Sequence, residues 1–329
     1  MSTIGTAVTL QDVARRLDAN GKVDKIVEML TETNEILQDM RWIEGNLPTG
    51  HKTTVRTGLP QATWRKLNYG VPTGKSTTAQ ITDTCGMLET YAEIDKALAE
   101  LNGNKAEFRL SEDRAFLEGM NQQMAETLFY EDTAKHPERF MGLAPRYNSL
   151  RADSGKNIVN AGGTGSDNTS IWLVCWGDNT AHGIYPKGSK AGFQHQDLGE
   201  VTLEDDARGR YQGYRTHYKW DCGLTVRDWR YISRVANIGV SSLAGTDCTD
   251  PASLIDLMID AYYKIPNMNM GKPVFYCNRT ILAYLHKQVR NDKNVNLYLD
   301  NVEGKPVVKF LGIPIRQCDQ IKNTETKVA

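Results

Sequence analysis

Apolar residues recur near helical spacing at the start of the chain, interrupted by a break at Asn20-Gly21. This pattern predicts helix over residues 9–40. Because the apolar stripe is thin and lies at a terminus, it is typical of a peripheral helix that packs on its own domain or on a neighbouring copy. The stripe consists of Leu10, Val13, Leu17, Ile26, Leu30, Leu37 and Met40.

The pattern changes over residues 45–86, which are rich in Gly, Pro and Thr and have no helical stripe. Alternation in TTVRT and AQITDT predicts two strands around a turn. A structureless loop of this length is uncommon in a compact domain, whereas two arms of about 15 residues would reach roughly 50 Å. An extended two-stranded arm and a solvated surface loop therefore both stay open. The segment has no acid before Asp83 and carries five cations, which are Lys52, Arg56, Arg65, Lys66 and Lys75.

Two helices are predicted next. Residues 87–101 return to helical spacing, and Asn102-Gly103 ends that run. A longer helix is predicted over residues 111–132, with Ser111 as its N-cap. Glu112 and Asp113 would lie in its first turn, where acids favour the helix dipole.

The second half of the chain indicates a mixed α+β domain. The apolar run IWLVCW predicts a buried strand at residues 171–176, and residues 177–221 are expected to be rich in loops because they show little periodicity. Helices are predicted from Pro251 and from Asn278. Further strands are predicted at residues 231–240, 273–276, 307–311 and 313–315.

Composition and charge narrow the class of protein. The formal net charge of -1 argues against a protein that mainly coats nucleic acid, because such proteins show a basic excess. The 6 cysteines include no CxxC pair, so reduced thiols are expected rather than a zinc site or a disulfide framework. The sequence shows no signal peptide and no apolar run of about 20 residues, which predicts a cytoplasmic protein without membrane spans.

Three motifs resemble functional sites, but the residues around them do not support those functions. Gly70 to Ser76, GVPTGKS, lacks the first glycine of a phosphate-binding loop, since Tyr69 stands in its place, and no helix follows. The glycines at residues 160–168 lead into a strand and so favour a tight turn. His182, His195 and His217 have no metal-ligand spacing. The sequence therefore predicts no catalytic residue, no cofactor and no metal.

Five collinear strings resemble the major capsid proteins of tailed bacteriophages, in particular the short-tailed epsilon-fifteen-like group. They are HPERFMGLAPRYNSL (136–150), TSIWLVCWGDNTAHGIYPKGSKAGF (169–193), LTVRDWRYISRVANI (224–238), MGKPVFYCNRTILAYLHKQV (270–289) and FLGIPIRQCDQI (310–321). This resemblance implies the Hong Kong 97-type capsid fold, in which an N-terminal arm, an E-loop β-hairpin and a long spine helix accompany peripheral and axial domains. The implied limits are residues 1–44 for the arm, 45–100 for the E-loop and its return segment, 101–235 for the peripheral domain, and 236–329 for the axial domain with the C-terminal return.

The resemblance further implies a shell protein that assembles with itself into pentamers and hexamers around double-stranded DNA. The expected inter-subunit contacts join the five E-loop cations to acids on the spine helix, namely Glu112, Asp113, Glu118 and Asp132. Portal, scaffold and decoration or stapling proteins are the other expected partners, within a virion capsid assembled in the host bacterial cytoplasm. Some members of this fold join an E-loop lysine to a neighbour's asparagine, but the sequence identifies neither that asparagine nor an assisting acid.

Two other functions remain as alternatives. A bacterial nanocompartment shell protein, similar to encapsulin, would keep the fold and change the contents. A soluble nucleotide-dependent enzyme would rest on Gly70 to Ser76 alone.

Overall fold

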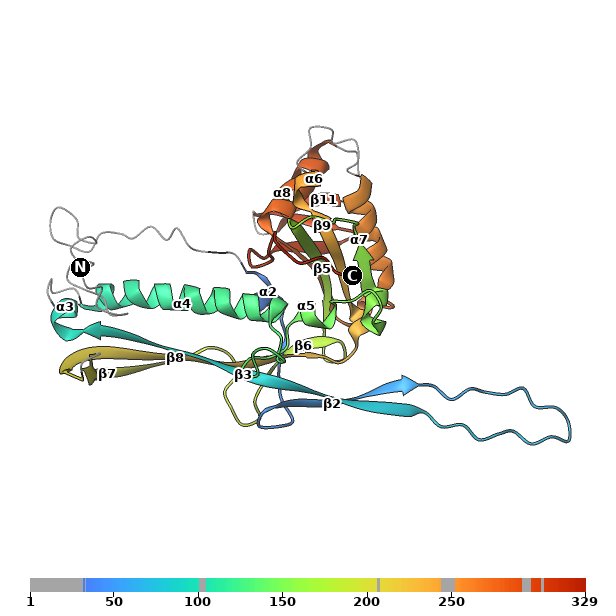
Figure 1. Cartoon of the computed structure of the whole chain (residues 1–329), viewed down its shortest axis with the longest axis horizontal. Helices are drawn as coiled ribbons and strands as arrows, with labels where there is room; N and C mark the ends of the chain where they lie inside the picture. Colours follow the sequence, from blue (N-terminus) through green and yellow to red (C-terminus); the bar gives the residue numbers. More distant parts are fainter. Residues whose placement is uncertain are drawn as a thin grey trace.

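The computed structural model describes residue 32 and residues 34–100, 105–205, 208–243, 252–291, 297–302 and 305–329. The chain forms one lobe along a long helix, a second lobe above one end of that helix, and a hairpin that projects away from both (Figure 1). The helix predicted over residues 9–40 lies mostly outside the described residues. The first described helix is α2 (Ile36–Asp39), and the first strand is β1 (Trp42–Glu44).

The first lobe packs α4 (Lys105–Tyr130) along a sheet of β3 (Thr77–Asp95), β8 (Arg210–Val226) and β7 (Gln194–Glu204). β3 pairs antiparallel with β8 from Cys85↔Gly223 to Asp95↔Gly213, and β7 pairs with the other edge of β8. Alternate strand residues therefore face the helix, where Ala92 and Tyr218 pack against Met120. Residues of the opposite face form cross-strand ion pairs, such as Glu93 with Arg215.

Two sequence predictions are wrong in this lobe. α4 begins at Lys105, so Ser111 lies inside the helix and is not its N-cap. The helix expected over residues 87–101 is strand as far as Asp95, and only α3 (Lys96–Glu100) is helical. Leu88 and Ile94 fit either periodicity, and the long ladder with β8 favours the strand.

The loop-rich region expected at residues 177–221 is also wrong. It contains β6 (Ala181–Tyr185), all of β7, and most of β8. β7 is largely exposed, and charged or polar residues occupy most of its positions, so it lacks the apolar alternation of a strand with one buried face.

The second lobe is a sheet with the strand order β13-β10-β5-β9, and β4 pairs with β9 at the far edge. Every residue of β5 is buried, because side chains of both its faces enter a core: Trp172 and Val174 lie in one cluster, Ile171 and Leu173 in the other. The strands are β4 (Ile158–Asn160), β5 (Asn168–Trp176), β9 (Ile232–Gly239), β10 (Lys272–Cys277) and β13 (Ile313–Gln317).

The helices α7 (Ala252–Lys264) and α8 (Arg279–Asn291) cover one face of this sheet, and the predicted strands and helices of this lobe are confirmed. Asn278 caps α8, since its side-chain Oδ1 accepts the Ile281 N–H at 2.9 Å. The remaining elements of the lobe are β11 (Leu297–Val302), β12 (Lys305–Phe310), α6 (Val240–Leu243) and the 3₁₀ helices η1 (Asp153–Asn157), η2 (Trp229–Tyr231) and η3 (Met268–Met270).

Of the two interpretations left open for residues 45–86, the structure shows the extended two-stranded arm. β2 (Gly50–Gly58) pairs antiparallel with the first part of β3, from Gly50↔Thr84 to Gly58↔Thr77. Residues 59–76 join the two strands at the far end (Figure 1). The hairpin leaves the body beside β1, β6 and the short helix α5 (Leu143–Arg146).

Candidate functional site

The hairpin presents the five predicted cations to solvent. Lys52 and Arg56 lie on β2, whereas Arg65, Lys66 and Lys75 lie in the connecting segment, and all five are exposed. The Arg65 side chain donates to the Tyr69 carbonyl at 3.2 Å, which shapes the turn at the end of the arm. No acidic residue lies between Gly45 and Thr82, so the arm is uniformly basic.

The end of the hairpin also exposes large apolar side chains. Trp64 is 100% exposed and Leu67 is 89% exposed. Leu59, Tyr69 and Val71 are exposed on the same segment. Several large apolar side chains exposed on one segment are unfavourable in water and usually mark a contact with another molecule. We call residues 59–76 the hairpin tip.

The base of the hairpin is fixed to the body by backbone and side-chain contacts. The Asn46 side chain bonds both the N–H and the carbonyl of Lys52 at 2.7 Å, as a neighbouring strand would. Asp83, which is buried, forms an ion pair with the partly buried Arg146 of α5 at 2.8 Å, and Arg146 also donates to the Leu224 carbonyl. These contacts fix the direction in which the arm leaves the body.

Two histidines face each other at this base. His51 of β2 and His182 of β6 have ring centroids 5.8 Å apart in an edge-to-face arrangement. His182 is buried, and burial, helped by the charges of His51 and Arg227, lowers its pKa to about 4. Burial also lowers the pKa of His51. Both rings are therefore neutral near pH 7.

We expect low pH to destabilise the structure around the base of the hairpin. The pKa of His182 lies below that of an unfolded chain, so the stability it contributes is complete above about pH 6.5 and is lost as the pH falls toward 4. The loss is about 3 kcal/mol at most. Urea unfolding across this pH range measures it. His182→Phe should flatten the pH dependence, whereas His195→Gln, at an exposed site, should leave it unchanged.

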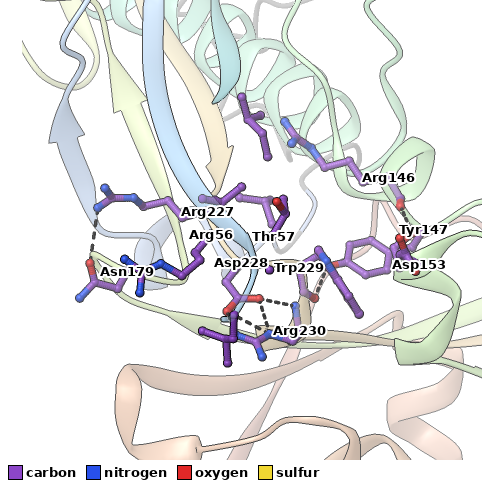
Figure 2. Close-up of a pocket in the computed structure, with 16 residues that line it drawn as sticks. Arg56, Thr57, Arg146, Tyr147, Asp153, Asn179, Arg227, Asp228, Trp229 and Arg230 are labelled. Atoms are coloured by element: carbon purple, nitrogen blue, oxygen red, sulfur yellow. Dashed lines mark hydrogen bonds and ion pairs between the residues drawn. The ribbon is translucent and has the colours of Figure 1, made fainter. Parts of the chain in front are cut away.

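A groove of about 1000 Å³ lies between the outer part of β2 and the segment of residues 226–230 (Figure 2). Asp228 binds Arg230 through both carboxylate oxygens, and Arg227 donates to the Asp178 carbonyl at 2.9 Å. The lining holds four arginines against two aspartates, so the groove continues the basic surface of the hairpin into the body. The charged lining residues are Arg56, Arg146, Arg227, Arg230, Asp153 and Asp228.

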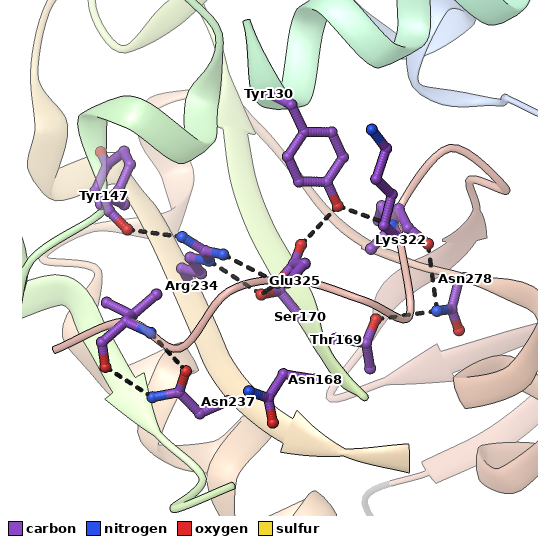
Figure 3. Close-up of polar contacts among 12 residues, drawn as sticks. Tyr130, Tyr147, Asn168, Thr169, Ser170, Arg234, Asn237, Asn278, Lys322 and Glu325 are labelled. Carbon is purple, nitrogen blue, oxygen red and sulfur yellow. Dashed lines mark hydrogen bonds and ion pairs between the residues drawn. The ribbon is translucent and has the colours of Figure 1, made fainter. Parts of the chain in front are cut away.

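A buried ion pair joins the C-terminal segment to both lobes (Figure 3). Arg234 of β9 contacts Glu325 at 3.0 Å, and each side chain is only 4% exposed. Arg234 also donates to Ser170 and to the Tyr147 carbonyl, while Tyr130 at the end of α4 donates to Glu325 at 2.6 Å. All polar groups of the pair are thus engaged, which is the condition under which a buried charge is tolerated.

The tail beyond Glu325 is held in the same way. Asn237 bonds the N–H and the carbonyl of Val328 at 2.8 and 3.0 Å, and the Leu150 N–H donates to the Ala329 carbonyl. Burial, then the Glu325 carboxylate, raises the pKa of the Tyr130 hydroxyl, which keeps it a donor. Sequence reasoning missed this cluster because its members lie far apart along the chain.

The comparison with family models now decides the family. The model described as major capsid protein GP7 matches residues 18–329. The chain belongs to this major capsid protein family. It is a structural component of a phage capsid, so it belongs to the virion and not to an enzyme family.

Solved structures agree with this family. A structure of bacteriophage epsilon15 is 44% identical, covers 100% of this chain and 99% of its own, and has a TM-score of 0.78. The capsid of bacteriophage JBD30 is 9% identical, with coverages of 89% and 92% and a TM-score of 0.50. A comparison with curated proteins gives no match. The fold of this capsid protein is therefore the Hong Kong 97 type.

The family model and the epsilon15 structure do not favour either alternative. A holo-SrpI encapsulin complex from Synechococcus elongatus is 12% identical, covers 70% of this chain and 96% of its own, and has a TM-score of 0.41. The enzyme hypothesis also fails on position, since Gly70 to Ser76 lie exposed in the hairpin tip and lead into β3 rather than into a helix. Within the described ranges no three His, Cys, Asp or Glu side chains form a metal site, and no helix could span a membrane.

The four predicted acids lie on or just after α4, and most are used within their own subunit. Glu112 is buried. Asp113 accepts a hydrogen bond from Tyr218, whose pKa is raised by burial and by this bond. Glu118 accepts the Glu32 N–H and the Gln122 side chain, and Asp132 accepts the Ala134 N–H. Within the described part of the chain no ion pair joins these acids to the hairpin cations, and Figure 1 shows the hairpin projecting away from α4.

The described cysteines offer no reactive thiol. Cys85, Cys175, Cys222, Cys277 and Cys318 are free, and Cys248 lies outside the described residues. Burial raises the pKa of Cys175 to about 11 and that of Cys85 to about 12. Thiolate chemistry near pH 7 is therefore suppressed at both positions.

Proposed function

We propose that this capsid protein assembles into pentamers and hexamers that form the icosahedral shell around double-stranded phage DNA. Each copy extends its hairpin over a neighbour, which makes a heterologous contact that closes into a ring. The observation that carries the proposal is the hairpin tip, where a fully exposed Trp64 stands among cations and other exposed apolar side chains. The folded unit is incomplete without a surface that covers this tip.

The receiving surface in this proposal is the α4 lobe of the neighbouring copy. Asp113, Glu118 and Asp132 keep partly accessible positions on or beside α4 and supply negative charge to the approaching cations. Glu112 takes no direct part because it is buried. Each exposed pair contributes only about 0.2–1 kcal/mol, so the apolar tip supplies most of the affinity and the charges set the orientation.

Charge reversal at the tip should weaken assembly. In a variant with Arg65→Glu and Lys66→Glu, two attractions become repulsions, each worth about 0.7 kcal/mol. The lowest protein concentration at which shells form should rise about 10-fold or more, since every copy repeats the contact. Light scattering across a concentration series measures this value.

The matched control reverses two exposed lysines outside the hairpin, Lys187→Glu with Lys190→Glu. The control should assemble within about twofold of the wild type. Equal assembly of the two variants would show that the tip cations are merely solvated.

The place of assembly and the other partners are also part of this proposal. We propose assembly in the host bacterial cytoplasm, with portal, scaffold and decoration or stapling proteins as accessory partners and with the packaged DNA held without sequence specificity. The domain limits at residues 1–44, 45–100, 101–235 and 236–329 stay predictions. Negative-stain microscopy of the purified protein tests the core of the proposal: rings or round shells support it, and a discrete monomer or dimer at every concentration contradicts it.

A further inference from the structure

Two helices lie at opposite edges of the sheet in the second lobe. α7 packs beside β9 and β4 at one edge, whereas α8 packs beside β13 and β11 at the other. Figure 1 shows α7 along one flank of the lobe and α8 on the opposite flank. Both helices bury their apolar sides in the same cluster, through residues such as Met258 and Leu285. Both helices cover the same face of the sheet, so their outer faces point away from it, near opposite edges of the lobe.

The outer face of α7 is acidic. Asp256, Asp260 and Tyr263 follow each other at steps of four and three residues, so they share one helix face. Both aspartates are exposed and Tyr263 is 77% exposed. Neither aspartate has an ion pair or hydrogen bond from its side chain to any residue in the described part of the chain. This face thus combines uncompensated negative charge with a large aromatic ring.

The outer face of α8 is basic. The helix contains Arg279, His286, Lys287 and Arg290 and no acid. Ala283, His286 and Lys287 are exposed, opposite the buried Ile281 and Leu285. Lys287 lies over the Tyr284 ring at 5.1 Å and has no carboxylate partner among the described residues. Arg279 is engaged by Asp319, so the available positive charge among the described side chains is that of Lys287.

We propose that the acidic face of α7 on one copy docks on the basic face of α8 on the next copy, an inference that rests on the proposed ring assembly. A ring requires each subunit to present two different, complementary surfaces on opposite sides. Opposite charges on the two flanks of one lobe meet this requirement. They also disfavour the closed two-fold dimer, because an α7–α7 or an α8–α8 contact would bring like charges together.

Two kinds of side chain make different contributions to this contact. Tyr263 supplies an apolar anchor with a polar hydroxyl, the combination that is enriched at protein interfaces. The charges of Asp256, Asp260 and Lys287 set the direction of the ring rather than most of its affinity, since exposed pairs are individually weak. The direction of the ring is then specified twice, once by the α7–α8 contact and once by the hairpin contact.

Charge exchange between the two faces tests the contact. One variant carries Asp256→Lys and Asp260→Lys, a second carries His286→Glu and Lys287→Glu, and a third carries all four changes. Each double variant should lose at least 10-fold in shell yield at the wild-type assembly concentration. The quadruple variant, in which opposite charges face each other again, should return to within about threefold of the wild type. Circular dichroism and thermal unfolding identify any variant that fails to fold.

The outcomes separate this contact from the proposed function. A folded double variant that assembles like the wild type would overturn the contact and leave the shell function intact. A quadruple variant that assembles no better than the double variants would also overturn it. A wild-type chain that forms neither rings nor shells would refute the proposed function, and the contact with it.

Discussion

A chain whose hairpin tip is replaced by a two-residue turn is expected to fold but not to form closed shells. Residues 59–76 would give way to Asn-Gly between Gly58 and Thr77, which are already paired across the hairpin, and Asn-Gly suits a type I′ turn. The tip contributes nothing to the core, because its large side chains are exposed. The melting temperature of the isolated subunit should therefore change little.

Assembly should suffer far more than folding. Covering Trp64 and Leu67 on a neighbour would contribute about 1.5–3 kcal/mol for each side chain, so each contact weakens by at least 100-fold without them. Sedimentation velocity with electron microscopy measures the loss of particles. A milder variant, Trp64→Ser with Leu67→Ser, keeps the length of the arm and should lose most of the same affinity. Shells of normal diameter and stability from either variant would contradict this role of the tip.

The second prediction with a large expected effect is a loss of subunit stability when the buried ion pair of Figure 3 is broken. In Arg234→Met, Glu325 loses its charge partner at a site where it is 4% exposed, while Tyr130 and Ser170 still donate to it. An uncompensated charge in such a site costs about 3–5 kcal/mol. The free energy of unfolding of the subunit should fall by that amount, as measured by denaturant titration.

The matched control is an exposed pair of the same chain. Lys156 and Asp153 lie 3.0 Å apart with side chains 72% and 83% exposed. Lys156→Met should change the unfolding free energy by no more than about 0.5 kcal/mol. If Arg234→Met proved equally mild, the C-terminal segment would not hold the two lobes together through this pair.

The elements that the sequence predicted correctly are those with a strong local signal. The extended arm was one of two interpretations of a segment rich in Gly, Pro and Thr, and its alternating strands favoured it, whereas β5 follows from its continuous apolar run. α8 was predicted from Asn278, and the structure shows that the Asn278 side chain caps the helix. In these segments tertiary packing and local preference agree.

The errors occur where tertiary context decides. β3 continues through residues 87–95 because β8 pairs with it, although Leu88, Tyr91 and Ile94 also fit a helix. β7 and β8 were not predicted because they contain many polar residues, and those of β8 include Arg215 and Lys219, which form cross-strand ion pairs with β3. The Arg234–Glu325 pair could not be predicted, since its partners are 91 residues apart and no local pattern links them.

The most direct test of the account is a cryo-electron microscopy map of the assembled particle that resolves the side chains of residues 59–76. The account predicts that Trp64 and Leu67 lie buried on the α4 lobe of a neighbouring copy, with Arg65 and Lys66 close to its carboxylates. A particle in which the tip points into solvent, or folds back on its own subunit, would contradict it.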